Sequence, residues 1–173
     1  MTPDHTLGLC SLLIGDCRAR LADIPDNSIH CCITSPPYWG LRDYGHGEQI
    51  GLEGTPEAYV EQMVAVFREV RRVLRDDGTC WLNLGDSYGC KGGNNITGLR
   101  EQQFGKGNAC GRQFDQRNKI SETADQRKTG LRAKQLVGIP WRVAFALQAD
   151  GWWLRQDIIW SKPNPMPESV TDR

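Results

Sequence analysis

The sequence has no long hydrophobic run, and its formal net charge at neutral pH is zero. Without a run of about 20 apolar residues no helix can cross a bilayer, and the N-terminus lacks the basic-then-apolar order of a secretion signal. A balanced charge gives no overall indication of a polyanionic partner. These absences argue against an integral membrane protein or a secreted protein, and we expect a cytoplasmic one.

Ordered sets of metal ligands are also missing. The chain has seven Cys and three His, but it has no Cys-x-x-Cys pair and no His at ligand spacing from the Cys. We therefore expect neither a structural zinc nor another metal site. Cys31 and Cys32 lie in a predicted buried strand, where Cys behaves as a small apolar residue. A catalytic thiolate attacking a pyrimidine is the alternative, but neither Cys has the Pro-Cys context expected for it.

The composition is that of a folded protein of about one domain. Apolar residues make up 39% of the 173 residues, with six Trp, which is typical of a packed core. The predicted strands and helices alternate. Strands are expected at 9–15, 29–34, 79–84 and 152–160, and helices at 17–24, 55–75 and 140–149. This alternation favours an α/β fold with a mostly parallel sheet and crossover helices.

The helix after Thr55 has the clearest pattern. Thr55 is a hydroxyl cap, Pro56 suits the first turn, and Asp76-Asp77-Gly78 marks the end. Its core-facing stripe consists of Tyr59, Met63, Phe67, Val70 and Leu74. Its second half carries Arg68, Arg71, Arg72 and Arg75, interpreted as a solvated face, with a DNA contact as the alternative. In the helix at 140–149 the candidates for the buried side are Trp141, Ala144, Phe145 and Leu147.

Residues 34–39 read Thr-Ser-Pro-Pro-Tyr-Trp and come at the end of the strand predicted at 29–34. Two consecutive prolines fix φ at about −65° and carry no N–H, so this corner is stiff and its carbonyls face no competing local donor. Ser35 adds a hydroxyl acceptor, and Tyr38 adds a flat ring. A rigid set of acceptors beside a stacking surface suits a planar base with an exocyclic amine.

The corner resembles the catalytic motif of the amino-methylating DNA methyltransferases, which transfer a methyl group from S-adenosylmethionine to N4 of cytosine or N6 of adenine. Other stretches match in the order of the permuted beta-type subgroup, whose catalytic portion comes first. They are Ile14–Cys17, Ile24–Ser28, Gly40–Gly45, Gly78–Ser87 and Ile159–Pro165. The match covers residues 7–86 and 136–173 and implies a Rossmann-like fold in a bacterial or phage-encoded protein.

The resemblance implies roles for single residues. The catalytic corner is Ser35, Pro36, Pro37 and Tyr38. The cofactor contacts are Asp16 and Thr34, and the substrate contacts are Trp39, Arg42, Asn83, Asp86, Lys162 and Asn164. The Ser35 hydroxyl and the Pro36 carbonyl would accept from the amine that is methylated, while Tyr38 stacks on the flipped base. The Asp16 carboxylate would accept from the cofactor's adenine amine, with capping of the next helix as an equal alternative.

Residues 87–135 break the regular pattern. The segment holds eight Gly, and ten Lys or Arg against four Asp or Glu, a net charge of +6. It follows a strand, where open α/β sheets place their ligands, and backbone phosphates are the natural partner of such a loop. We interpret it as a basic, Gly-rich insertion that contacts double-stranded DNA, within a partial catalytic domain spanning 1–173. An incidental surface insertion is the alternative.

One family feature has no counterpart in the sequence. The Gly-rich cofactor loop of the Phe-x-Gly-x-Gly type lies C-terminal in this subgroup, and nothing here matches it. We therefore expect an incomplete fold whose C-terminal cofactor half is missing. The explanations are a fragment, a truncated reading frame, or a half that pairs with a separate polypeptide. The chain alone should bind the cofactor weakly and turn over little or not at all.

Three alternatives remain for the activity. Ser35 favours cytosine N4, because the resemblance associates Asp or Asn at that position more with adenine N6. A methyltransferase of RNA or protein amides has a similar Pro-Pro-Tyr corner, but usually with Asn first and its Gly loop upstream, and neither holds here. The third alternative is a catalytically inactive fragment that binds DNA.

Overall fold

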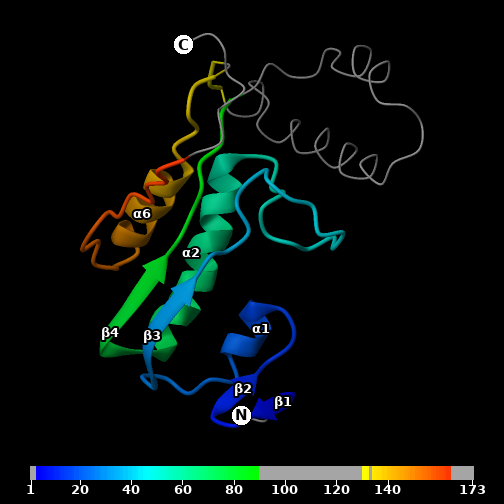
Figure 1. Ribbon diagram of the computed structural model, residues 1–173, viewed down its shortest axis with the longest axis vertical. Coiled ribbons are helices and arrows are strands. Elements are labelled where there is room, and N and C mark those ends of the chain that lie inside the picture. The colour runs from blue at the N-terminus through cyan, green and yellow to red at the C-terminus, as the bar shows by residue number, and fades with distance from the viewer. Residues whose placement is uncertain (1–2, 90–129, 133, 165–173) are drawn as a thin grey trace.

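The computed structural model describes residues 3–89, 130–132 and 134–164 (Figure 1). Its first elements are strands β1 (His5–Leu7) and β2 (Cys10–Leu12) and helix α1 (Cys17–Leu21). The larger elements are strand β3 (Ile29–Thr34), helix α2 (Pro56–Val73), strand β4 (Leu74–Leu82) and helix α6 (Ile139–Ala149). In the described part of the chain, no helix combines the length and apolarity needed to span a membrane.

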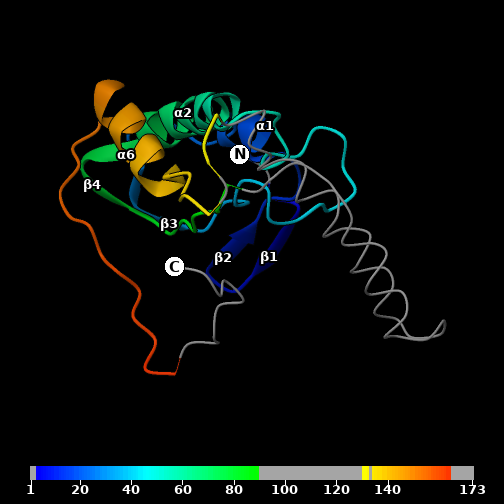
Figure 2. The ribbon, with the colours of Figure 1, turned by 90° about the horizontal axis from the view of Figure 1, so that it is seen from above.

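Strands β3 and β4 form a parallel pair connected through α2, as the strand–helix–strand spacing predicted. Residues Cys31–Thr34 are paired in register with Thr79–Leu82. Helices α2 and α6 lie together on one side of this pair (Figure 2). The expected α/β class is therefore present as one parallel strand–helix–strand unit with a second helix against it.

The core lies between α2, α6 and the strand pair. The predicted stripe is confirmed on α2 for Tyr59, Met63, Phe67 and Val70, which are buried, whereas Leu74 is buried but begins β4. The Thr55 Oγ1 accepts from the Ala58 N–H at 3.2 Å, as expected of the cap. The helix ends at Val73, earlier than predicted, and β4 begins at the next residue. An extended backbone at Leu74 (ψ 144°) ends the helix before Asp76 is reached.

The buried side of α6 differs from the prediction. Trp141 and Phe145 are 49% and 56% exposed, whereas Ile139, Val143 and Leu147 face the core. These three recur every four residues, so they form the stripe against α2 and leave the larger rings on the outer face. There the rings of Trp141 and Phe145 stack on each other with centroids 6.1 Å apart.

The strands also depart from the prediction at three places. Residues 9–15 contribute only β2, which pairs antiparallel with β1 in a separate hairpin. Residues 152–160 are extended and mostly exposed but form no strand, because no described strand pairs with them. Strand β3 is not buried on both faces, since Cys31 is exposed and Ile33 is 81% exposed.

Most of the basic insertion, residues 90–129 and 133, lies outside the described residues. Its two ends are held side by side. Tyr88 and Leu136 form an antiparallel bridge, and the Gly89 N–H donates to the Gln135 carbonyl at 2.8 Å. The insertion therefore leaves and re-enters the domain at one place, between the end of β4 and the start of α6.

Candidate functional site

The corner after β3 brings three predicted site residues together. The Ser35 hydroxyl lies 3.2 Å from the Tyr38 hydroxyl, and the Asn83 amide donates to that same tyrosine oxygen at 3.0 Å. Ser35 and Asn83 are exposed, and Tyr38 is half-buried. The two sides come from neighbouring strand ends, since the Asn83 N–H donates to the Thr34 carbonyl at 3.0 Å.

The carbonyl groups of the corner differ in what they bind. The Pro37 carbonyl accepts from the Tyr59 hydroxyl at 2.9 Å, and the Tyr38 carbonyl accepts from the Leu41 N–H at 3.2 Å. Among the described residues no donor reaches the Pro36 carbonyl. The corner thus leaves the Pro36 carbonyl and the Ser35 oxygen as acceptors, while α2 fastens the next carbonyl through Tyr59.

Two glycines allow the corner to be this close-packed. A Cβ at Gly85 would lie 2.8 Å from two carbons of the Tyr38 ring, and a Cβ at Gly51 would lie 3.1 Å from the Tyr38 carbonyl oxygen. Gly51 also has φ +106°, which an L-residue rarely adopts. The roles of Gly51, Gly85 and the Tyr59 hydroxyl at this corner could not be predicted from sequence, because these contacts join segments distant in sequence.

Trp39 does not line the opening, contrary to the prediction that it walls the base pocket. Its side chain is 0% exposed, its indole N–H donates to the Glu53 carbonyl at 3.0 Å, and its own carbonyl accepts from the Ser87 hydroxyl at 3.0 Å. A ring this large is buried where it can pack against α2 and α6. Trp39 therefore supports the corner from beneath.

Asp86 holds the start of α6. Its carboxylate accepts from the backbone N–H groups of Gly138 and Ile139, each at 3.0 Å, and from the Ser87 N–H at 2.8 Å. Gly138 at the helix start has no side chain to act as a cap. The carboxylate predicted to contact substrate is thus engaged as a remote helix cap.

Asp16 caps α1, as one of its two predicted roles requires. Its carboxylate accepts from the Arg18 N–H at 2.8 Å and from the Arg18 guanidinium at 2.5 to 3.1 Å. The hydrogen bonds from the Arg18 side chain and backbone lower the pKa of Asp16 to about 2. The carboxylate is therefore ionised at neutral pH, and its side chain remains 44% exposed.

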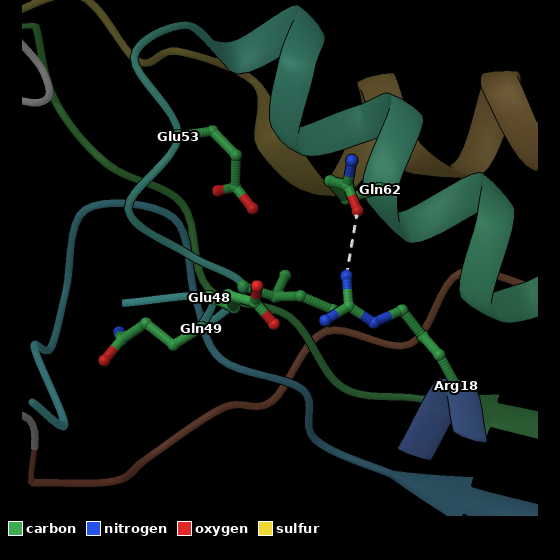
Figure 3. Close-up of a pocket in the computed structure, with 6 residues that line it drawn as sticks. Arg18, Glu48, Gln49, Glu53 and Gln62 are labelled. Carbon is green, nitrogen blue, oxygen red and sulfur yellow. Dashed lines mark hydrogen bonds between the residues drawn. The ribbon is translucent and has the colours of Figure 1, made fainter. Parts of the chain in front are cut away.

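Arg18 also lines a cleft of about 520 Å³ between α1, the loop 48–53 and α2. Figure 3 shows its guanidinium reaching toward Gln62, to which it donates at 3.4 Å, with the Glu53 carboxylate projecting toward the same space. Burial raises the pKa of Glu53. The remaining lining residues are Glu48, Gln49 and Ile50. The cleft thus combines a cation, two carboxyl groups and two amides.

The other predicted contacts are not brought to the corner. Lys162 and Asn164 are exposed on the extended segment that follows α6, which runs clear of the strand pair in Figure 2. The Arg42 side chain is exposed, and its carbonyl accepts from the Gln49 amide at 2.9 Å.

The predicted arginine row makes contacts within the protein, with Arg68, Arg71 and Arg72 on α2 and Arg75 on β4. Arg68, Arg72 and Arg75 form ion pairs with Asp150, Glu69 and Asp77 respectively. Arg71 donates to the Asp150 carbonyl at 2.8 Å. These partners favour the interpretation of this row as a structural, solvated face over the DNA-contact alternative.

Comparison with known proteins places this corner in a family. The model of a DNA methylase family, N6_N4_Mtase, matches residues 29–173, which include the corner, β4 and α6. The chain therefore belongs to this family of amino-methyltransferases, which depend on S-adenosylmethionine.

Individual relatives are similar over nearly all of the chain. It is 46% identical over 172 residues to the Type II methyltransferase M.SmaI of Serratia marcescens, covering 98% of this chain and 53% of the relative. It is 49% identical over 165 residues to the Type II methyltransferase M.XycI of Xanthomonas campestris pv. cyanopsidis, covering 94% and 50%. The chain thus spans about half the length of these relatives. No solved structure matches it.

Proposed function

We propose that the chain is the catalytic portion of a DNA methyltransferase that methylates the exocyclic amine of a flipped base, with cytosine N4 preferred over adenine N6. The observation that carries the proposal is the pair of acceptors at the end of β3: the exposed Ser35 hydroxyl and the Pro36 carbonyl, which no described donor reaches. The family and the relatives' names support DNA as the substrate.

The corner would assist the nucleophilic attack of an aromatic amine on the methyl group. The lone pair of such an amine is delocalised into the ring, so the nitrogen is a poor nucleophile until the amine is held out of conjugation. Two acceptors on its hydrogens stabilise the positive charge that develops on nitrogen, and they act more strongly in the transition state than in the ground state. Once the nitrogen has taken the methyl group, it releases one proton to water at the exposed corner and returns to neutrality. No covalent enzyme intermediate is required.

The cofactor supplies the methyl group as a sulfonium when bound, and the residues present fit part of it. The cleft beside Asp16 offers carboxyl groups for an ammonium or amine, and Arg18 for a carboxylate. Asp16 can accept from an adenine amine only by sharing its oxygens with Arg18. We therefore assign Asp16 and Arg18 to one edge of the cofactor site. The Gly-rich loop expected of the family has no counterpart among these residues, so they account for only one edge of the site.

DNA contacts are assigned to the basic insertion and to the segment with Lys162 and Asn164. The insertion emerges beside the corner, because Ser87 at its stem donates to the Trp39 carbonyl. Its net charge of +6 suits phosphates. Arg42 lies in the loop that follows the corner, where a cation can reach the backbone of a strand whose base has been flipped.

The experiment compares three preparations on unmethylated genomic DNA, which presents every recognition sequence. They are the chain alone, the chain fused to the C-terminal half of the M.SmaI relative, and that fusion with Ser35→Ala. Incorporation of tritiated methyl groups is expected only with the unsubstituted fusion. Full incorporation by the chain alone would show that no second half is needed. A folded, cofactor-binding fusion without incorporation would overturn the proposed activity.

A further inference from the structure

The hydroxyl of Tyr38 links two groups that the proposed reaction does not otherwise connect. Its oxygen lies 3.2 Å from the Ser35 hydroxyl on one side and 3.0 Å from the Asn83 amide nitrogen on the other. The amide nitrogen has hydrogens and no lone pair to offer, so the tyrosine oxygen accepts from Asn83. The three side chains form one chain of hydrogen bonds across the ends of β3 and β4.

We propose that Asn83 is a positioning residue for methyl transfer and acts through the Tyr38 hydroxyl. To accept from the base's amine, the Ser35 oxygen must direct its own proton elsewhere. The tyrosine oxygen has a second lone pair at the right distance to take that proton. By donating to the tyrosine oxygen, Asn83 keeps that oxygen an acceptor toward Ser35, so that the lone pairs of Ser35 face the amine. This inference rests on the proposed function and assigns Asn83 to the machinery of the corner.

The packing around Tyr38 supports such a role. The ring is pressed against Gly85, where a Cβ would lie 2.8 Å away, and the neighbouring Pro37 carbonyl is fastened by Tyr59. Backbone and ring are therefore fixed by other contacts. What Asn83 adds is the direction of the Tyr38 O–H bond: its amide occupies one lone pair of the oxygen, so the tyrosine proton points away from Asn83 and a second lone pair stays available to Ser35.

A double-mutant cycle tests the proposal in the fused enzyme. Asn83→Ala removes the hydrogen bond from Asn83 to the Tyr38 oxygen, and Tyr38→Phe removes that bond together with the one to Ser35. Each variant should lower kcat about three- to tenfold while KM for DNA stays within about twofold. If Asn83 acts through the Tyr38 hydroxyl, the kcat of the double variant is no lower than the kcat of the less active single variant. Asn83→Asp should retain most of the rate, because its carboxylate can hold the tyrosine oxygen by accepting the Tyr38 proton. A double variant that loses the product of the two single effects would overturn the relay.

A second measurement uses the chain alone and needs no activity. In ¹⁵N-labelled protein, the side-chain amide signals of Asn83 should move on Tyr38→Phe and stay in place on Tyr44→Phe, a matched loss of an exposed hydroxyl. Unmoved signals on Tyr38→Phe would refute the relay. If the fused enzyme fails to methylate DNA, the proposed function falls, and these signals still decide whether Asn83 and Tyr38 are linked. Gln148→Ala on the exposed side of α6 controls for the kinetic variants.

Discussion

Gly85 allows the ring of Tyr38 to occupy its position, because a side chain at residue 85 would collide with that ring. It follows β4 by three positions, and the Tyr38 ring occupies the space that any side chain there would need. The neighbours cannot easily give way, because the Tyr38 hydroxyl is held by Asn83 and the backbone before it by Tyr59. The glycine is therefore part of the proposed catalytic corner although it carries no functional group.

Gly85→Ala is expected to lower the free energy of unfolding by about 1–3 kcal/mol, the usual cost of overpacking. Gly54→Ala is the matched control, since nothing lies within 4 Å of a Cβ at that position, and its effect should stay within about 0.5–1 kcal/mol, in either direction. Urea unfolding followed by tryptophan fluorescence measures both. Equal stability of the two variants would mean that the ring does not rest on Gly85.

The stiffness of the corner could be predicted from neighbouring residues in the sequence, but the contacts of its side chains could not. The Ser-Pro-Pro-Tyr order fixes a stiff corner through bonds within the chain, so its acceptors could be predicted from sequence. The partners of those residues come from α2, the loop 48–53 and the end of β4. Trp39 illustrates the limit, because a Trp after Tyr38 suits either a pocket wall or a core, and only the tertiary packing makes it the core.

Among the helices, α6 depends on a group outside itself. It begins after Gly138, which has φ +79° and no side chain. Asp86 at the end of β4 supplies the acceptor for the first two N–H groups. A carboxylate there also opposes the positive end of the helix dipole favourably. Asp86 precedes the insertion in the sequence and α6 follows it. The cap therefore fixes the start of α6 relative to the end of β4.

Asp86→Ala is expected to cost about 0.5–2 kcal/mol of stability, the range for loss of a helix cap. Asp86→Asn keeps an acceptor oxygen and should lose less. Circular dichroism during urea unfolding gives both values, with Glu61→Ala on the exposed face of α2 as the control. The capping role is contradicted if Asp86→Ala and Glu61→Ala unfold at the same urea concentration.

A helix or strand could be predicted from sequence where the residues that determine it lie within that element. Helix α2 could be located from its cap, its proline and its apolar stripe, all of which lie within the helix. The exposed face of α6 could not, because two aromatic rings and three aliphatic side chains compete for one buried side. The strand predicted at 152–160 needs a neighbouring strand, and no described strand pairs with it.

At the scale of the part of the chain that the structure describes, one face of the parallel strand pair is covered and the other is not. Cys32, Cys80 and Leu82 pack toward the helical core, whereas the register partners Ile33 and Trp81 on the other face are 81% and 52% exposed. Parallel sheets are usually covered on both faces. The prediction that a C-terminal half completes this fold stays a prediction, and the uncovered face is where such a half would pack.

The most direct test of the account is to locate the transferred methyl group. DNA treated with the fused enzyme is digested to nucleosides and analysed by mass spectrometry against 4-methylcytosine, 6-methyladenine and 5-methylcytosine standards. The proposed mechanism predicts a methyl group on an exocyclic nitrogen, with 4-methylcytosine as the main product, and a rate lower by roughly 100- to 1000-fold for Ser35→Ala. A methyl group on carbon 5, or an unchanged rate without the Ser35 hydroxyl, would contradict it.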